Sequence, residues 1–395
     1  MISVYVHIPF CVKRCAYCDF VTYTGMDELL MVYADAISKE ISLVTSNQAE
    51  KMQLASLYFG GGTPSLLPFE GFKRIFESIH DCFEVIEDAE ITVEANPGTV
   101  RRHDFTELVA LGVNRISLGV QSLNPDDLRK LGRIHDVHEV FASIRAAHQA
   151  GIKNISLDLI FGLPWQDLAS WKKTLRNALL FKPQHISLYA LTLEENTPLA
   201  VWIEKGFYNT PNEDEAADMY EYAMVILASA GYQQYEISNW SKGELFASKH
   251  NMQYWLNNSY LGFGAGAHSS ANHYRLENLP GIKDYIDALQ VSNFETIYPF
   301  SPANTFIIKN DRFTEMQETM MLGLRLVKDG VSNHSFYQRY GSNINDVFEQ
   351  EIAELHNWRL VEWVKVNNDI RLRLTKKGTL LGNQVFIRFV GEPDK

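Results

Sequence analysis

The first half of the chain alternates between short apolar or β-branched runs and longer stretches with helical periodicity, which limits the folds open to it. Apolar residues recur at i, i+3, i+4 and i+7 in the expected helices, residues 28–44, 69–82, 137–149 and 171–181. The expected strands are residues 2–8, 54–59, 90–95, 114–119, 154–161 and 185–190. This alternation predicts an α/β fold with a parallel sheet and right-handed crossovers. Six units are too few for a closed eight-fold barrel, so we expect an open, partial (βα)6 barrel.

The regular alternation breaks near residues 194–198, and two further regions are expected after it. The middle region is more aromatic and less regular, with a helix at residues 213–230, and is expected to be an α+β segment. The last region is expected to be a small winged-helix-like domain with a helix, a hairpin and a final helix, at residues 313–327, 360–374 and 375–389. The expected domains are residues 1–198, 199–305 and 306–395.

Charge and hydropathy narrow the classes of function. The 395 residues carry a formal net charge of −12, without the basic footprint expected of a nucleic-acid-binding protein. In the last region, Trp358, Glu362 and Trp363 lie where a DNA-binding winged helix needs basic residues, which favours a structural or partner-binding role. No apolar run approaches the roughly 18 residues needed to cross a bilayer, and no charged leader precedes the first strand. We therefore expect no transmembrane segment and no signal or transit peptide.

Three of the four cysteines, Cys11, Cys15 and Cys18, lie directly after the first expected strand. Thiolates at this C-x3-C-x2-C spacing can bind three irons of a 4Fe–4S cluster and leave the fourth iron open. Cysteines that are clustered rather than spread also indicate a reducing compartment, so we expect a cytoplasmic protein. The alternatives are a zinc site, for which His7 is the close candidate for a further ligand, and a disulfide.

Unusual residues stand at the ends of the expected strands. In parallel βα folds the carboxyl ends of the strands form the rim that holds the active site. The segments concerned are residues 60–64, 94–98, 119–122, 158–164 and 189–190. Asp158 is notable because a carboxylate inside an otherwise apolar strand is costly unless it binds a partner. The cysteine loop follows the first strand, so we predict one site that includes it at this rim.

With the cysteine motif, Gly60–Pro64, Gln121, Arg133 and Asp158 in place, the chain resembles the oxygen-independent coproporphyrinogen III oxidase (HemN-like) family of radical S-adenosylmethionine (SAM) proteins. The resemblance runs along nearly the whole chain. It implies a 4Fe–4S cluster bound by the three cysteines, with the open iron chelating the amino and carboxylate groups of SAM.

The same resemblance assigns the contacts to SAM. It places Tyr17 against the adenine, with packing of the cluster loop as the alternative. The loop containing Gly61, Gly62 and Thr63 would bind the amino group, since glycines allow the backbone to approach a ligand closely. Asp158 would bind the ribose hydroxyls.

Further SAM contacts follow from the resemblance. Glu94, Gln121 and Arg133 would make polar contacts, and Arg133 is a natural bidentate partner for a carboxylate. Ala190 would offer backbone groups to the adenine. Tyr5 corresponds to a SAM-contacting tyrosine, although its position in the strand equally suits barrel packing. The alternative for Arg133 is a surface ion pair with a nearby acid, Asp126, Asp127 or Asp136.

Three departures from the dehydrogenase of this family point to its heme-chaperone branch, the HemW type. Phe20 stands where the dehydrogenase has an extra cysteine. The first strand is expected to start at residue 2, so we expect the chain to lack the N-terminal extension that helps the dehydrogenase bind a second SAM. Residues 250–255, His-Asn-Met-Gln-Tyr-Trp, match the H-N-x-x-Y-W signature of the branch. The alternatives are a coproporphyrinogen III dehydrogenase and a radical-SAM enzyme with an unknown substrate.

The heme-chaperone interpretation implies heme and an apo-hemoprotein acceptor as partners, with a respiratory hemoprotein as one candidate, and a homodimer. His250 and Tyr254 are the first candidates for heme ligands, followed by His7 and His268. The alternative is that His250 and Asn251 hold a loop against the barrel by hydrogen bonds while Tyr254 packs in the core.

Overall fold

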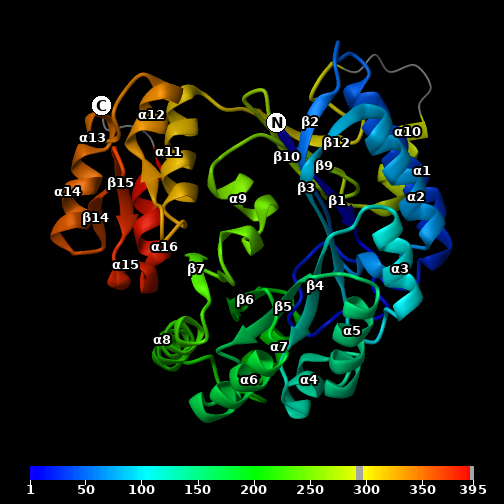
Figure 1. Cartoon of the computed structure of the whole chain (residues 1–395), viewed down its shortest axis with the longest axis horizontal. Helices are drawn as coiled ribbons and strands as arrows, with labels where there is room; N and C mark the ends of the chain where they lie inside the picture. Colours follow the sequence, from blue (N-terminus) through cyan, green and yellow to red (C-terminus); the bar gives the residue numbers. More distant parts are fainter. Residues whose placement is uncertain (291–296, 392–395) are drawn as a thin grey trace.

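The computed structural model describes residues 1–290 and 297–391. Within these residues, one sheet of 12 strands forms the centre of the molecule (Figure 1). Its strands, in spatial order, are β12 (Asn304–Lys309), β11 (Tyr274–Asn278), β10 (His268–Ala271), β9 (Tyr260–Phe263), β1 (Ile2–Ile8), β2 (Met52–Gly61), β3 (Phe83–Ala95), β4 (Arg115–Gln121), β5 (Asn154–Phe161), β6 (His185–Ala190), β8 (Asn239–Ser241) and β7 (Gln233–Glu236).

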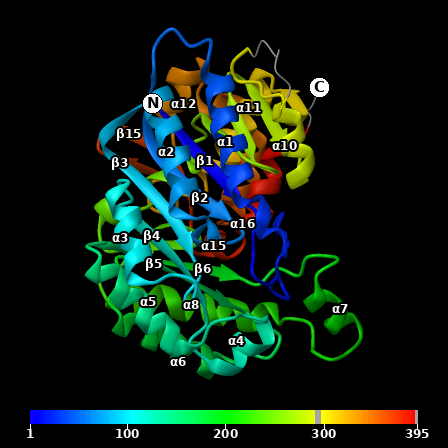
Figure 2. The ribbon, with the colours of Figure 1, turned by 90° about the vertical axis from the view of Figure 1, so that its right-hand side faces the viewer.

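Strands β1 to β6 are parallel neighbours in chain order, which confirms the expected α/β architecture. Helices connect them, and Figures 1 and 2 show these helices along the outer side of the sheet. The connecting helices are α1 (Leu30–Thr45), α2 (Phe69–Cys82), α3 (Arg102–Ala110), α4 (Pro125–Leu131), α5 (Val137–Gln149) and α6 (Leu168–Leu180). The expected bounds of α2, α5, β1, β5 and β6 are confirmed. At α5 the expected cap is confirmed as well, because Asp136 accepts the N–H of Glu139.

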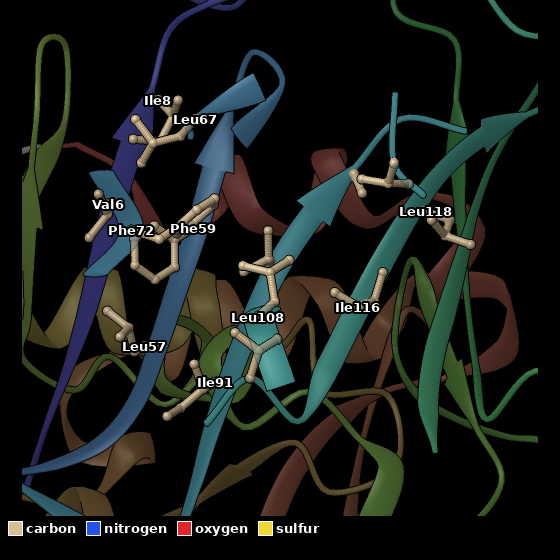
Figure 3. Packing of buried hydrophobic residues seen from close by; sticks show 14 of the residues in the cluster. Val6, Ile8, Leu57, Phe59, Leu67, Phe72, Ile91, Leu108, Ile116 and Leu118 are labelled. Carbon is tan, nitrogen blue, oxygen red and sulfur yellow. The ribbon is translucent and has the colours of Figure 1, made fainter. Parts of the chain in front are cut away.

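The two faces of the parallel strands differ in chemistry, as the two-residue period of a strand requires. Outward side chains such as Val6, Phe59 and Ile116 are buried against the helices (Figure 3). Phe59 contacts Phe72 of α2 edge to face at 5.2 Å. The inner face is polar and buried instead, and includes Ser3, Ser56, Thr92, Ser117 and Ser156. The sheet therefore provides a polar inner wall on which a ligand site can be built.

The middle region does not form a sheet of its own. Its strands extend the barrel sheet at both edges, because β9 pairs in parallel with β1 and β8 pairs antiparallel with β6. Its helices are α7 (Pro198–Glu204), α8 (Glu213–Ser229), α9 (Lys249–Trp255) and α10 (Ile282–Gln290). The sequence placed these residues in a separate segment, since strand pairing over such distances along the chain leaves no local pattern.

Helix α9 lies on the inner side of the sheet, between the barrel and the C-terminal helices (Figure 1). Its start is fixed by the buried carboxylate of Glu90 on β3. The hydroxyl of Ser248 and the backbone N–H groups of Lys249 and His250 each donate to this carboxylate at 3.1 Å. The unpaired N–H groups and positive end of a helix make such an anion contact favourable. The H-N-x-x-Y-W segment is thereby held against the barrel.

A second buried carboxylate, that of Glu40 on α1, joins the barrel to the middle region. Burial raises its pKa, which four hydrogen-bond donors partly offset. The donors are Tyr285 Oη (2.6 Å), Ser301 Oγ (2.6 Å), Asn278 Nδ2 (2.8 Å) and the backbone N–H of Gly264 (3.0 Å). Because all four groups donate, the position requires an acceptor on both side-chain oxygens.

The C-terminal region has its own small core and a three-stranded antiparallel sheet. The strands are β13 (Val331–Ser332), β15 (Asp369–Leu374) and β14 (Val361–Val366), so the expected hairpin is confirmed. The helices are α11 (Arg312–Gly323), α12 (Asn333–Tyr340), α13 (Ile344–Val347), α14 (Glu349–Asn357), α15 (Lys376–Leu380) and α16 (Gly382–Phe386).

Two helix predictions in this region were wrong at their ends. Helix α11 ends at Gly323, although the buried side chain of Leu324 continues the apolar period into the following turn. The last helix begins after Thr375 as expected but is broken at Leu381, whose φ of −111° and ψ of 27° are not helical. In both places the apolar periodicity continues past the end of the helix.

Candidate functional site: a cavity at the rim of the barrel

A cavity of about 440 Å³ opens at the carboxyl ends of the barrel strands. Its lining contains every residue predicted for the cluster or for SAM except Tyr5, namely Cys11, Cys15, Tyr17, Cys18, Gly61, Gly62, Thr63, Glu94, Gln121, Arg133, Asp158 and Ala190. These residues come from separate strand ends and loops, as the rim argument expects. A volume of this size falls within the range of small-molecule sites, about 300–1,000 Å³.

The three cysteines follow β1 in a loop that is fixed by backbone hydrogen bonds. The N–H of Cys11 donates to Tyr23 O at 2.8 Å, and that of Ala16 donates to Leu131 O at 3.0 Å. All three thiols are half-buried, and burial raises the pKa of Cys11 and of Cys18. Polar side chains face the sulfurs: Thr63 Oγ1 lies 3.6 Å from Cys11 Sγ, Arg133 Nη1 lies 3.3 Å from Cys15 Sγ, and Thr22 faces Cys18.

The residues present fit a cluster held by three thiolates. No fourth cysteine and no histidine is found among the described residues that line the cavity. Gly62 is packed so closely that a Cβ there would lie 2.6 Å from Phe10 O and 2.9 Å from Cys11 Sγ. The glycine loop therefore serves first to let the cysteine loop approach β2. Close packing of the two loops therefore requires a glycine at position 62, in addition to the expected contact of this loop with a ligand.

The alternatives to a cluster find less support. All four cysteines are free, so the described residues contain no disulfide. His7, the candidate for a further zinc ligand, has both ring nitrogens engaged, by Tyr5 Oη at 2.9 Å and Val21 O at 3.0 Å. Across residues 1–290 and 297–391, no compact group of three or more His, Cys, Asp and Glu side chains could hold a single metal ion.

Glu94, at the end of β3, is an acid whose pKa is changed by this environment. Burial raises its pKa to about 7, although a hydrogen bond from Tyr58 Oη at 2.7 Å favours the charged form. The nearby carboxylate of Asp158 raises the pKa further. A cationic ligand would lower the pKa of Glu94 again, because a nearby positive charge favours the ionised carboxylate. Glu94 is thus placed to recognise the cationic part of a ligand.

Asp158, on β5, already has protein partners. Ser117 Oγ donates at 2.8 Å and Ser156 Oγ at 3.1 Å. Burial still raises the pKa of the carboxyl group, so these hydroxyls offset only part of the desolvation cost. Asp158 therefore depends less on a ligand than its strand sequence indicated, because the side chain lies among hydroxyls on the polar inner face of the sheet.

Arg133 is not in the surface ion pair considered as an alternative. Its side chain lines the cavity, where Nη2 donates to Gly119 O at 2.8 Å and makes a short hydrogen bond to Asn96 Oδ1. Asn96 in turn donates to Thr63 Oγ1 at 2.9 Å. The guanidinium thus ties three of the rim loops together, and its Nε has no hydrogen-bond partner among the described residues.

Gln121 and Ala190 lie at the ends of β4 and β6, where both line the cavity. Gln121 has a φ of 65°, in the left-handed region that residues other than glycine rarely adopt. Such strain is common at binding sites, where the surrounding structure holds it.

Tyr17 lines the cavity and also packs against Leu131, Ile160 and Leu163. Tyr17 can therefore both pack the cluster loop and face a ligand in the cavity, so the two roles expected for it are compatible.

His250 lies under the cavity floor and is 1% exposed. Its Nδ1 and Nε2 are each 2.9 Å from a hydroxyl, that of Ser56 and that of Tyr254 respectively. Its ring stacks on Tyr58 at 4.9 Å. Burial lowers the pKa of His250 to about 3, so the imidazole is neutral. This is the environment expected of a histidine that holds a segment against the barrel, and direct ligation of heme by His250 stays a prediction.

Comparison with known proteins places this geometry in a family. The radical SAM superfamily model matches residues 5–178, and the HemN C-terminal domain model matches residues 311–381. The heme chaperone HemW of Bacillus subtilis is 36% identical over 393 residues, which cover 99% of this chain and 100% of that protein. The chain belongs to the HemW family. HemW of Lactococcus lactis is likewise 36% identical, over 98% of this chain and 97% of that protein.

A solved structure supports the fold of this HemW-family chain. Coproporphyrinogen III oxidase (HemN) of Escherichia coli aligns with a TM-score of 0.83 and 24% identity, over 98% of this chain and 89% of that one. The likeness shows a shared architecture that extends beyond the barrel. None of the helices in residues 1–290 and 297–391 has the length and apolarity needed to cross a membrane.

The HemW-family cavity is also lined by Tyr58, Asn96, Ser117 and Tyr189, which were assigned no role from the sequence, although the rim segments 94–98 and 189–190 contain Asn96 and Tyr189. Two of them could have been predicted from strand alternation. Tyr58 and Ser117 precede Gly60 and Gly119 by two residues, and residues two apart in a strand lie on the same face of the sheet. Asn96 lies within the segment 94–98, at the end of an expected strand. No local signal separated its side chain from its neighbours.

Proposed function

We propose that the chain is a cytoplasmic heme chaperone, which binds heme and transfers it to an apo-hemoprotein acceptor. The observation that carries this proposal is the 36% identity, over nearly the full length of both chains, to the protein named heme chaperone HemW in Bacillus subtilis. The similarity includes the middle and C-terminal regions, so it covers more than the domain shared by radical-SAM proteins in general.

The cofactors proposed are a 4Fe–4S cluster bound by Cys11, Cys15 and Cys18 and an exchangeable SAM. The three half-buried thiols at one wall of the cavity support the cluster, as does the radical SAM family match. A cluster with one open iron would supply a chelation point for SAM and a source of one electron. The buried acid Glu94 supports a cationic ligand in the same cavity.

A coproporphyrinogen III dehydrogenase remains the competing function because of the shared fold. Phe20 argues against it, since the resemblance places an extra cysteine of the dehydrogenase at this position. Phe20 is 67% exposed at the rim of the cavity, where a solvent-exposed aromatic ring is suited to cover a further apolar ligand. A homodimer is part of the proposal, to be tested by sedimentation of the reconstituted protein.

The cofactor part is tested by anaerobic reconstitution with iron and sulfide. We expect four irons per chain in the wild type and loss of the charge-transfer absorption in Cys15→Ser. Cys82→Ser is the matched control, because Cys82 lies at the end of α2, away from the cavity. Iron content that is equal in the two variants would contradict the assignment.

The chaperone part is tested by titrating the reconstituted protein with heme and following the Soret band, then adding an apo-hemoprotein and following its holo spectrum. Saturable binding followed by transfer is expected. Turnover of coproporphyrinogen to protoporphyrinogen under anaerobic conditions with SAM would overturn the proposal in favour of the dehydrogenase.

A further inference from the structure

A second cavity, of about 380 Å³, lies beside the cluster cavity and has a different lining. We call it the aromatic cavity; its lining is Tyr5, His7, Asp19, Phe20, Val21, Tyr254, Tyr260, Gly266 and His268. It is bounded by β1, the end of the cysteine loop, α9 and the β9–β10 strands. Asp19 and Phe20 line both cavities, so one short segment of the cysteine loop separates them.

The aromatic cavity connects the H-N-x-x-Y-W segment to a space large enough for a ligand. Tyr254 lines the cavity and contacts Tyr260 edge to face at 4.6 Å. His250 lies behind this wall and holds the hydroxyl of Tyr254 at 2.9 Å. Phe20 completes the apolar lining from the opposite element. Flat aromatic walls of this kind favour a flat, apolar ligand.

Most groups in this cavity that could bind iron are already engaged. Tyr5 and His7 bond each other, Tyr254 bonds His250, and Tyr260 Oη accepts from Arg275 Nη1 at 3.3 Å. Burial also raises the pKa of Tyr254 well above its usual value, which opposes its binding iron as a phenolate.

His268 differs from these groups. Its side chain is exposed, and its ring has no hydrogen bond to any residue in the described part of the chain. Its backbone is firmly placed at the start of β10, where it pairs with Glu277 of β11. Gly262 packs against it so tightly that a Cβ there would lie 2.1 Å from His268 O. An imidazole on a rigid strand at the mouth of an aromatic cavity is suited to ligate a metal centre.

We propose that heme binds in the aromatic cavity, with the ring of His268 as an axial ligand of its iron and with Phe20, Tyr254 and Tyr260 against its macrocycle. This rests on the proposed function, since it names the site at which that heme is held. The H-N-x-x-Y-W segment then contributes a wall through Tyr254, which His250 positions, and no ligand from His250. Heme at this site lies against the loop that carries the three cysteines.

The test is an anaerobic heme titration of the reconstituted chain, comparing wild type with His268→Ala. We expect the variant to bind heme roughly tenfold or more weakly, with a shifted Soret band, because the axial imidazole is lost. Added imidazole is expected to restore the wild-type Soret position in the variant. His273→Ala is the matched control, since His273 is an exposed histidine that faces Glu315 outside the aromatic cavity.

The outcomes separate the two proposals. Weakened binding in His268→Ala, normal binding in His273→Ala and rescue by imidazole support the site. Saturable heme binding that His268→Ala leaves unchanged in affinity and spectrum overturns the site and leaves the chaperone proposal standing. Absence of saturable heme binding by the wild type overturns both. Unfolding curves of the variants, which are expected to match the wild type, exclude misfolding as the cause of any loss.

Discussion

Replacement of His250 by alanine tests whether this histidine has a structural role. The side chain is 1% exposed, and hydroxyls hold both of its nitrogens. Ser56 Oγ donates its proton to Ser3 Oγ at 2.7 Å, so Nδ1 of His250 must donate to Ser56 and Nε2 must accept from Tyr254. In this tautomer Nδ1 carries the proton and the lone pair of Nε2 accepts a hydrogen bond, so neither nitrogen has a free lone pair to bind iron.

The cost of His250→Ala follows from these contacts. Truncation of a buried ring leaves a cavity, and such changes cost about 3–5 kcal/mol for aromatic side chains. Two hydrogen bonds are lost, each with a net value of about 1 kcal/mol, and the buried hydroxyl of Tyr254 loses its partner. Imidazole is smaller than a phenyl ring, so we expect the free energy of unfolding to fall by about 4 kcal/mol.

The assay is equilibrium urea unfolding of the heme-free protein, followed by circular dichroism. Heme is left out so that loss of a ligand cannot change the apparent stability. His268→Ala is the control and is expected to change the free energy of unfolding by less than about 0.5 kcal/mol, because its ring is exposed. A His250→Ala protein within about 1 kcal/mol of the wild type would refute the structural role derived from its contacts.

Three further predictions concern other buried groups. Because the pKa of Glu94 is about 7 in the ligand-free chain, SAM is expected to bind roughly tenfold more weakly at pH 6 than at pH 8, as measured by calorimetry. The affinity is expected to depend little on pH in Glu94→Gln, and likewise for S-adenosylhomocysteine, which lacks the sulfonium charge. Glu40→Gln is expected to lower the free energy of unfolding by about 2–3 kcal/mol, because an amide nitrogen would face groups that all donate; urea unfolding measures this. Gly62→Ala is expected to lower the iron content after reconstitution, because its Cβ would collide with Phe10 O and Cys11 Sγ. Gly151→Ala is strained at its own φ of 96°, but its Cβ meets no atom within 4 Å, so it is expected to keep its iron.

Each of these predictions has a result that would contradict it. A SAM affinity that does not change between pH 6 and pH 8 would remove the case for Glu94 as the group that meets the cation. An unchanged unfolding midpoint in Glu40→Gln would mean that the donors around it rearrange. Equal iron content in the two glycine variants would show that the cysteine loop tolerates displacement from β2.

The pH dependence of stability from Glu94 has a definite sign. Its folded pKa is raised above the unfolded value near 4.5 to about 7. The protonated carboxyl is therefore favoured by folding, and the stability that it contributes is complete below about pH 4.5 and lost as the pH rises through about 7. Ligand binding removes this loss when the ligand supplies a positive charge.

The sequence by itself determined the parallel sheet and predicted which residues meet at its rim. Strand runs such as residues 154–161 and helices such as residues 69–82 have a local period that the structure confirms. The rim residues follow strand ends, so topology alone predicts that they meet, and the cavity contains all but Tyr5 of them. These residues meet because the carboxyl ends of parallel strands share one edge whatever the side-chain packing.

The tertiary structure alone decided the roles that depend on which face a residue takes and on contacts between distant segments. It placed Asp158 among hydroxyls on the inner face, turned Arg133 toward Asn96 and Cys15, and put His250 beneath the cavity floor with both nitrogens occupied. These contacts join residues far apart in the chain, up to 194 positions for Ser56 and His250. Such contacts leave no periodic trace, because they arise when whole elements pack and not from the preference of any short segment.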